Sequence, residues 1–206
     1  GQFSSERFAV LFKPGQYADV RMQMGYYTTA AGLGLSPEDV TLGYFNVNAQ
    51  WFDGNATHNF WRGAENCTVT GDVQWAVSQA TSFRRMNILG GMSLSDGGWS
   101  SGGYIADSRV AGAIDSGSQQ QWFTRNSEFA QYRNDGWSRV FVGCEGQTPG
   151  GAWPSGRSTV IEESPVVSEK PFLVFEAGIG YSVFIPALRQ NAAGVSWDGG
   201  VIRGEY

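Results

Sequence analysis

Apolar side chains recur along the middle of the chain at intervals close to twenty residues. Four segments share one form, in which a short apolar or mixed run ends in a glycine or small-residue turn: 64–71, 83–90, 104–112 and 139–146. A less regular segment of the same kind covers 122–129. Val69, Ile88 and Val110 stand just ahead of three of these turns, at spacings of 19 and 22 residues. A period near twenty with strand-like units is typical of a solenoid.

One such unit cannot bury its apolar face alone, whereas stacked units can. Successive residues of a strand point to opposite faces, so each unit can turn its Val, Ile or Leu inward and its polar residues outward. Neighbouring strands about 4.8 Å apart then share backbone hydrogen bonds and one continuous core. We therefore predict an all-β parallel β-helix with coils over 1–146. An irregular loop followed by further strands is expected over 147–206.

Shorter patterns outside the repeats predict individual elements. Residues 8–12 and 40–47 read as strands, and Ser36 with Pro37 predicts a capped single turn between them. Residues 159–161 form a short strand candidate. Residues 172–175 and 181–185 predict either a hairpin or a pair of coils.

The ends of this solenoid predict a larger assembly. About twenty residues per coil allows roughly seven to nine coils, and the outermost ones expose unpaired strand edges. Solenoids normally cap such edges, and neither end of the sequence shows a polar amphipathic helix for that purpose. We expect a second chain or domain to continue the β-helix.

Composition removes two classes of partner. The 206 residues carry a net charge of −5 with only two lysines, Lys13 and Lys170, which argues against nucleic acid, since phosphate binding needs a dense basic face. No apolar run approaches 18 residues, so no membrane span is expected. Cys67 and Cys144 lie about three coils apart, roughly 14 Å, beyond the ~7 Å limit for a disulfide, and predict two separate buried thiols.

Several segments together resemble a known superfamily. The opening runs FAVLFKPGQY (8–17) and GYYTTAAGLGLSPEDVTL (25–42) are similar to the first coils of pectate-lyase-like right-handed parallel β-helices. Together with SGSQQQWFTRNSE (116–128) and the SEKPFL and YSVFIP runs, they resemble the N-terminal half of secreted two-β-helix glycoside hydrolases of the family 55 type. The resemblance implies a right-handed β-helix, an extracellular location and a polysaccharide substrate. It places no catalytic signature of the family on a residue of this sequence.

The candidate chemistry lies in the middle of the chain. Glycoside hydrolysis needs two carboxyl groups, and adjacent coils of a β-helix supply neighbouring side chains readily. Asp115 and Glu128 flank an amide-rich strand that contains Gln120 and Trp122, and we assign them as the catalytic pair. Each carboxylate could instead form a turn or pair with an arginine such as Arg109.

Two similar loops are candidates for sugar binding. Asp96 with Trp99 and Asp135 with Trp137 occur in near repeats, and the two tryptophans are 38 residues apart, about two coils. Such tryptophans would lie on one side of the solenoid about 10 Å apart. An indole offers a flat apolar face to a sugar ring, and a carboxylate accepts its hydroxyls. Alternatively, Asp-Gly forms the turn and tryptophan covers the end of a coil.

Other chemistries fit less well. His58 is the only histidine, so a His-rich zinc site is excluded, and a Ser-His-Asp triad would depend on that residue. No metal or other cofactor is expected. The sequence thus favours a secreted polysaccharide-degrading glycoside hydrolase with a glycan as partner. The alternatives are a non-catalytic glycan-binding or structural β-helix, and a polysaccharide lyase.

Overall fold

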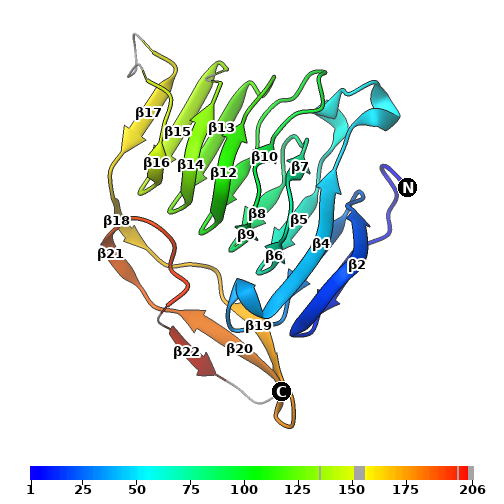
Figure 1. The fold of residues 1–206 in the computed structure, drawn as a ribbon, viewed down its shortest axis with the longest axis vertical. Coiled ribbons are helices and arrows are strands. Elements are labelled where there is room, and N and C mark those ends of the chain that lie inside the picture. Colours follow the sequence, from blue (N-terminus) through cyan, green and yellow to red (C-terminus); the bar gives the residue numbers. More distant parts are fainter. Residues whose placement is uncertain (135, 151–155, 199, 204–206) are drawn as a thin grey trace.

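Two long parallel sheets form the body of the molecule (Figure 1). The computed structural model describes residues 1–134, 136–150, 156–198 and 200–203. Sheet A has eight strands in this order: β1 (Phe8–Phe12), β3 (Thr28–Gly32), β5 (Arg62–Glu65), β8 (Ser82–Arg84), β11 (Tyr104–Ala106), β13 (Gln121–Arg125), β15 (Ser138–Val142) and β17 (Ser158–Ile161).

Sheet B faces sheet A across the core. It contains β2 (Gly15–Gln23), β4 (Val40–Val47), β6 (Thr68–Val69), β7 (Val73–Trp75), β9 (Asn87–Ile88), β10 (Met92–Ser93), β12 (Arg109–Asp115), β14 (Glu128–Arg133) and β16 (Glu145–Gln147). The chain alternates between the two sheets, and each strand pairs in parallel with the equivalent strand of a neighbouring coil. The predicted parallel β-helix is confirmed.

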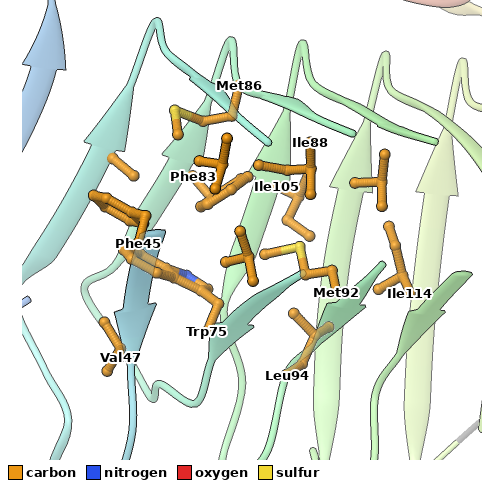
Figure 2. Packing of buried hydrophobic residues seen from close by; sticks show 14 of the residues in the cluster. Phe45, Val47, Trp75, Phe83, Met86, Ile88, Met92, Leu94, Ile105 and Ile114 are labelled. Atoms are coloured by element: carbon orange, nitrogen blue, oxygen red, sulfur yellow. The ribbon is translucent and has the colours of Figure 1, made fainter. Parts of the chain in front are cut away.

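The repeated apolar residues align from coil to coil. Val69 pairs with Ile88, and Ile88 pairs with Val110. All three are buried, at 0 %, 0 % and 2 % exposure. Figure 2 shows Ile88 and Ile105 in this core beside Phe83, Met86 and Met92. The period of the sequence therefore reports one inward position per coil.

Shorter predicted elements are also confirmed. Strands β1 and β4 match residues 8–12 and 40–47, and β17 covers the predicted strand at 159–161. The 3₁₀ turn η1 (Pro37–Asp39) has Ser36 as its N-cap with a full capping box. Two further 3₁₀ turns, η2 (Gln50–Phe52) and η3 (Ala56–His58), lie in the longest loop. Strand β17 extends sheet A one strand beyond Gly146, where the coils were expected to end.

The last forty residues turn back along the solenoid instead of adding coils. In this C-terminal arm (164–203), β18 (Ser164–Val167) pairs with β21 (Arg189–Ala192). Strand β20 (Gly180–Pro186) pairs with β19 (Phe172–Glu176) and β22 (Gly200–Arg203). All of these pairings are antiparallel, so the hairpin alternative holds for 172–185. Figure 1 shows the arm in yellow to red, opposite the side on which the loops from sheet B to sheet A gather.

A column of left-handed corner residues joins the arm to the coils. Each of the five corners from sheet A to sheet B between β5 and β16 has one residue with φ between 45° and 60°. This corner column consists of Asn66, Arg85, Asp107, Asn126 and Gly143. Asn126 donates its side-chain N–H to the carbonyl of Ala192 (2.9 Å), and the amide of Gly194 donates to the carbonyl of Gly143 (2.9 Å). At the other end, the amide of Phe175 donates to the carbonyl of Leu33 (2.7 Å), so the arm reaches the second coil, which β3 and β4 form.

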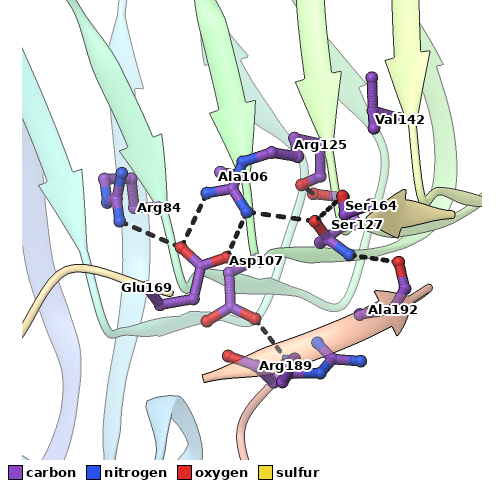
Figure 3. A network of polar contacts seen from close by, with 12 residues as sticks. Arg84, Ala106, Asp107, Arg125, Ser127, Val142, Ser164, Glu169, Arg189 and Ala192 are labelled. Atoms are coloured by element: carbon purple, nitrogen blue, oxygen red, sulfur yellow. Dashed lines mark hydrogen bonds and ion pairs between the residues drawn. The ribbon is translucent and has the colours of Figure 1, made fainter. Parts of the chain in front are cut away.

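Buried charges strengthen the same contact (Figure 3). Glu169 of the arm pairs with Arg84 (3.1 Å) and with Arg125 (2.6 Å), which belong to different coils of sheet A. Asp107 accepts a hydrogen bond from the amide of Ser196 (2.5 Å) and pairs with Arg85 (3.4 Å). Burial and the charge of Glu169 raise the pKa of Asp107 to about 6.

The two cysteines are free, as expected. Cys67 is buried and Cys144 half-buried. Burial raises the pKa of the Cys67 thiol to about 12 and that of Cys144 to about 11, so both are protonated at neutral pH and unreactive.

Neighbouring residues of one coil provide a test of the inward positions. Ile88 is 0 % exposed and Leu89 is 52 % exposed. Replacing Ile88 by Ala should lower the free energy of unfolding by about 2–5 kcal/mol through lost burial and a cavity. Leu89→Ala should change it by no more than about 0.5 kcal/mol. Chemical denaturation of both variants checks this, and equal losses would contradict the assigned register.

The raised pKa of Asp107 predicts a pH dependence of stability. The ordinary Asp pKa is 3.8, so between about pH 4 and pH 6 the folded state holds a proton that the unfolded state has lost. This contribution to stability is full at low pH and is lost as the pH rises through about 6. The free energy of unfolding of wild type should therefore fall by about 2 kcal/mol more than that of Asp107→Asn between pH 4.5 and pH 7. Asp19→Asn, an exposed carboxyl, should follow wild type; parallel profiles for wild type and Asp107→Asn would contradict the assignment.

Candidate functional site

Polar side chains of sheet B line up in one register row. Residues Asn46, Gln74, Ser93, Asp115 and Arg133 are successive partners on neighbouring strands. They point outward because the residues just before them, such as Met92 and Ile114, are buried. At about 4.8 Å per step this polar row is roughly 19 Å long. It presents donors and acceptors at regular intervals along the solenoid.

The polar row lines a surface groove of about 620 Å³. Tyr44 and Asp72 stand beside the row, and Gly91, Gly112 and Ala113 form a floor with almost no side chains. A ligand can therefore approach the backbone closely between these polar groups. A groove of hydroxyl-binding groups with an aromatic neighbour suits a carbohydrate better than an apolar molecule.

Asp115 lies in this groove in a fixed position. Its Oδ1 accepts hydrogen bonds from the amide of Gly117 (2.8 Å) and the side chain of Asn134 (2.5 Å). Oδ2 has no hydrogen-bond partner among the described residues, so it is available to a ligand. The carboxylate thus forms a turn and also faces the groove.

Glu128 does not lie beside Asp115, so the predicted catalytic pair is wrong as a pair. Asp115 is in register with Arg133, and Glu128 is five residues earlier on that same strand. At about 3.3 Å per residue the two carboxyl-bearing residues are roughly 16 Å apart. Paired carboxyl groups of glycosidases are about 5–9.5 Å apart.

Glu128 belongs to another carboxylate pair beside the C-terminal arm. It is in register with Glu145 on the next coil, and Arg109 pairs with it at 2.7 Å. A Cβ placed on Gly194 would lie 3.1 Å from Oε1 of Glu128 and 2.9 Å from Oε1 of Glu145. The two oxygens are therefore within about 6 Å, near the separation found in retaining enzymes. The amide of Val195 donates to Glu128 (3.2 Å), so Glu128 fastens the arm, whereas Glu145 is exposed and both glutamates line a small surface pocket of about 310 Å³.

The two tryptophan loops have the predicted geometry. Ser100 bridges to Gln119 on the next coil, and the amide of Trp137 donates to the carbonyl of Gln120 (3.0 Å), so the loops lie two coils apart on one side. Trp99 is 65 % exposed and Trp137 is 66 % exposed. These loops directly follow the ends of β10 and β14, where Ser93 and Arg133 of the polar row lie. The two rings therefore form an exposed aromatic ridge on the side of the solenoid into which the strands of the groove lead, and the role of this ridge in binding stays a prediction.

The other four residues predicted to bind sugar lie in different surroundings. Trp122 is wrong as a binding residue, because it is 3 % exposed and its ring points into the core. Asp96 accepts hydrogen bonds from the amide of Ala49 and from Gln74, both at 2.7 Å, and so joins two loops. Gln120 is half-buried between the two tryptophan loops, and Asp135 lies outside the described residues.

Other catalytic arrangements are not formed by the described part of the chain. Residues 98–102 match the G-x-S-x-G pattern of serine hydrolases, but Ser100 is fully buried and bonded to the hydroxyl of Ser118 (2.9 Å). No group of three or more His, Cys, Asp or Glu residues that could hold a metal occurs within it. None of its helices is long and apolar enough to cross a membrane.

Removing the ridge should weaken sugar binding without unfolding the protein. Trp99→Ala and Trp137→Ala together should lower the affinity for a bound polysaccharide at least tenfold, because each loses a flat stacking surface. Thermal stability should change little, since both rings are exposed. Trp122→Ala, in contrast, should cost about 3–5 kcal/mol of stability. Affinity electrophoresis and thermal melting separate the two effects; unchanged migration of the double variant would remove the ridge from the site.

Comparison with known proteins agrees with this architecture. No family model matches the sequence. The chain is 51 % identical over 210 residues to an exo-beta-1,3-glucanase of Streptomyces sp. (strain SirexAA-E / ActE), a match over 99 % of the chain and 34 % of that protein. It therefore spans about a third of the relative's length.

Solved structures give the same result. The structure of sacteLam55A from Streptomyces sp. SirexAA-E matches with a TM-score of 0.91 and 49 % identity, over 99 % of this chain and 38 % of that one. A variant of sacteLam55A in complex with glucose matches at 50 % identity with the same TM-score. The resemblance to family 55 glucan hydrolases inferred from the sequence is thus confirmed along nearly the whole chain, which is similar to one part of a larger exo-β-1,3-glucanase.

Proposed function

We propose that this chain is one β-helical part of a secreted glycoside hydrolase that removes sugar from the ends of a β-1,3-glucan. The observation that carries the proposal is the 51 % identity to an exo-beta-1,3-glucanase over 99 % of the chain. A polymeric glucan is met outside the cell, which supports an extracellular location.

Within such an enzyme, the polar row and the tryptophan ridge serve to hold the glucan. The groove floor of Gly91, Gly112 and Ala113 admits a sugar chain close to the backbone, and the exposed rings of Trp99 and Trp137 offer stacking surfaces beside it. Stacking covers the apolar face of a glucose ring, while the groups of the row bond its hydroxyls.

The reaction itself needs a second part of the protein. Hydrolysis uses one carboxylic acid and one carboxylate, and the groove holds Asp115 without a carboxylate partner at catalytic distance among the described residues. We propose that the remaining two-thirds of the enzyme supplies the partner group.

Two alternatives make different use of the same surface. A non-catalytic β-helix would bind glucan through the groove and ridge and release no product. A polysaccharide lyase would need a uronate substrate and a neutralising cation, and the described residues include no carboxylate cluster for one. The glucanase relative favours hydrolysis over both.

Replacement of the matched third of the Streptomyces enzyme by this chain tests the proposal. The chimaera should release glucose from a β-1,3-glucan and none from an α-1,4-glucan. If Asp115 takes part in catalysis, Asp115→Asn in the chimaera should lower kcat about 10²–10⁴-fold, as expected for loss of an acid or base. Glu128→Gln, which alters the contacts with Arg109 and the arm away from the groove, should leave kcat within a few-fold.

Three results would contradict the proposal. A folded chimaera that binds β-1,3-glucan but releases no product would favour the non-catalytic alternative. Products with unsaturated ends from a uronate polymer would favour the lyase. Unchanged kcat in Asp115→Asn would place both catalytic groups outside this chain.

A further inference from the structure

A second concave surface lies on the opposite sheet from the groove, near the first coils. This sheet A pocket has a volume of about 700 Å³. Its floor is a register row of small residues on β1, β3, β5 and β8: Ala9, Thr29, Gly63 and Ser82. The hydroxyls of Thr29 and Ser82 have no hydrogen-bond partner among the described residues, so both can bond a ligand.

One wall of the pocket consists of two aromatic residues in a costly backbone conformation. Tyr27 and Trp61 stand immediately before β3 and β5, with φ of 52° and 53°. A left-handed conformation costs a bulky residue about 1–2 kcal/mol, whereas Gly would adopt it freely. Ala80, at the equivalent position before β8, has the same conformation (φ 58°). The corner therefore requires a left-handed residue, and the aromatic rings are not the cause of this conformation. Strain of this kind points to a function for the side chains themselves.

The two rings form a continuous face that solvent can reach. Their centroids are 5.5 Å apart with planes at 41°, and Trp61 is 51 % exposed. Both line the pocket beside Thr29 and Ser82. A flat apolar wall next to hydroxyl groups matches a sugar ring, which has an apolar face and a polar rim.

The charges around the pocket are already engaged. The guanidinium carbon of Arg7 lies 3.1 Å from the centroid of the Tyr27 ring. Arg62, beneath the wall, donates to the carbonyl of Phe60 (2.7 Å) and to the side chain of Gln2 (2.9 Å). Burial lowers the pKa of Arg62 to about 10, so it stays charged at neutral pH. Both guanidinium groups are held by contacts within the chain, and no described carboxylate pairs with either, so the hydroxyls of Thr29 and Ser82 are the groups left to bond a ligand, which suits the hydroxyls of a neutral sugar.

We infer that the sheet A pocket is a second carbohydrate-binding site, in which a β-1,3-linked gluco-oligosaccharide stacks on Trp61 and bonds Thr29 and Ser82. The choice of this sugar rests on the proposed function. Since the groove lies on sheet B, the pocket binds a separate stretch of the polymer and keeps the glucan at high local concentration near the groove.

Site-specific NMR of the 206-residue chain tests this inference. The eight tryptophan indole N–H signals report on each ring separately, and the Trp61 signal is the one missing from the spectrum of Trp61→Gly. Titration with a β-1,3-linked glucose pentamer should shift the Trp61 signal to saturation. A maltopentaose titration serves as the control sugar and should leave it in place.

Variants separate a binding role from a structural one. Trp61→Gly relieves the backbone strain, so its melting temperature should stay within a few degrees of wild type. Its pentamer affinity at this site, followed by the backbone amide signals of Thr29 and Ser82, should fall at least tenfold. Ser82→Ala should weaken the shifts of Trp61 several-fold with the ring still present. Phe52→Ala removes an exposed ring at the same end of the molecule, outside the pocket, and should leave the Trp61 titration unchanged.

The outcomes distinguish this site from the proposed function. If the Trp61 signal stays in place while those of Trp99 and Trp137 shift, the sheet A pocket is not a sugar site and glucan binding at the groove still stands. A Trp61 shift with the pentamer in a chimaera that hydrolyses no glucan would support the pocket and refute the proposed function. Destabilisation of Trp61→Gly with unchanged affinity would show that the ring serves packing, and would overturn the inference.

Discussion

The structure depends on the register between neighbouring coils. Parallel pairing places Val69, Ile88 and Val110 directly above one another, so each inward side chain contacts the equivalent residue of the next coil. A slip of one residue would turn every inward side chain outward, since the side-chain period of a strand is two. The same rule brings Ser93, Asp115 and Arg133 together on the outer surface. Core and groove are therefore two consequences of one pairing.

The corner column adds a second constraint to this register. A left-handed residue at each of the five corners between β5 and β16 turns the chain from sheet A to sheet B, and four of these five residues also bond the arm. Asn126 fulfils both tasks, since Asn tolerates this conformation and its amide bonds the arm. Asp107 does the same at the cost of a buried carboxyl group, which Arg85 and the amide of Ser196 compensate.

The sequence contained enough information for the fold and for part of the site. The coils were predictable because an apolar residue recurs at nearly constant spacing, and the tryptophan loops followed from the same count. Trp122 could not be placed, since it lies between Gln121 and Phe123 and the alternation there is ambiguous. In the structure the side chain of Trp122 is buried, whereas those of Gln121 and Phe123 are exposed.

The pairing of Asp115 with Glu128 failed for a geometric reason. From β5 onward, residues that meet on adjacent coils are 16 to 22 positions apart, as are Asp115 with Arg133 and Glu128 with Glu145. Two residues 13 positions apart fall at different points of the coil. The arm escaped prediction because a strand pattern such as 172–175 does not reveal which partner it takes.

The arm also changes how the molecule should come apart. A stack of coils in which each contacts only its neighbours can fray from either end, one coil at a time. Here the arm bonds Leu33 in the second coil and Gly143 near the last, so coils that never touch share one tether. Loss of either end would release contacts at the other. Amide exchange should therefore report one cooperative unit across the coils, in place of the graded protection of an untethered solenoid.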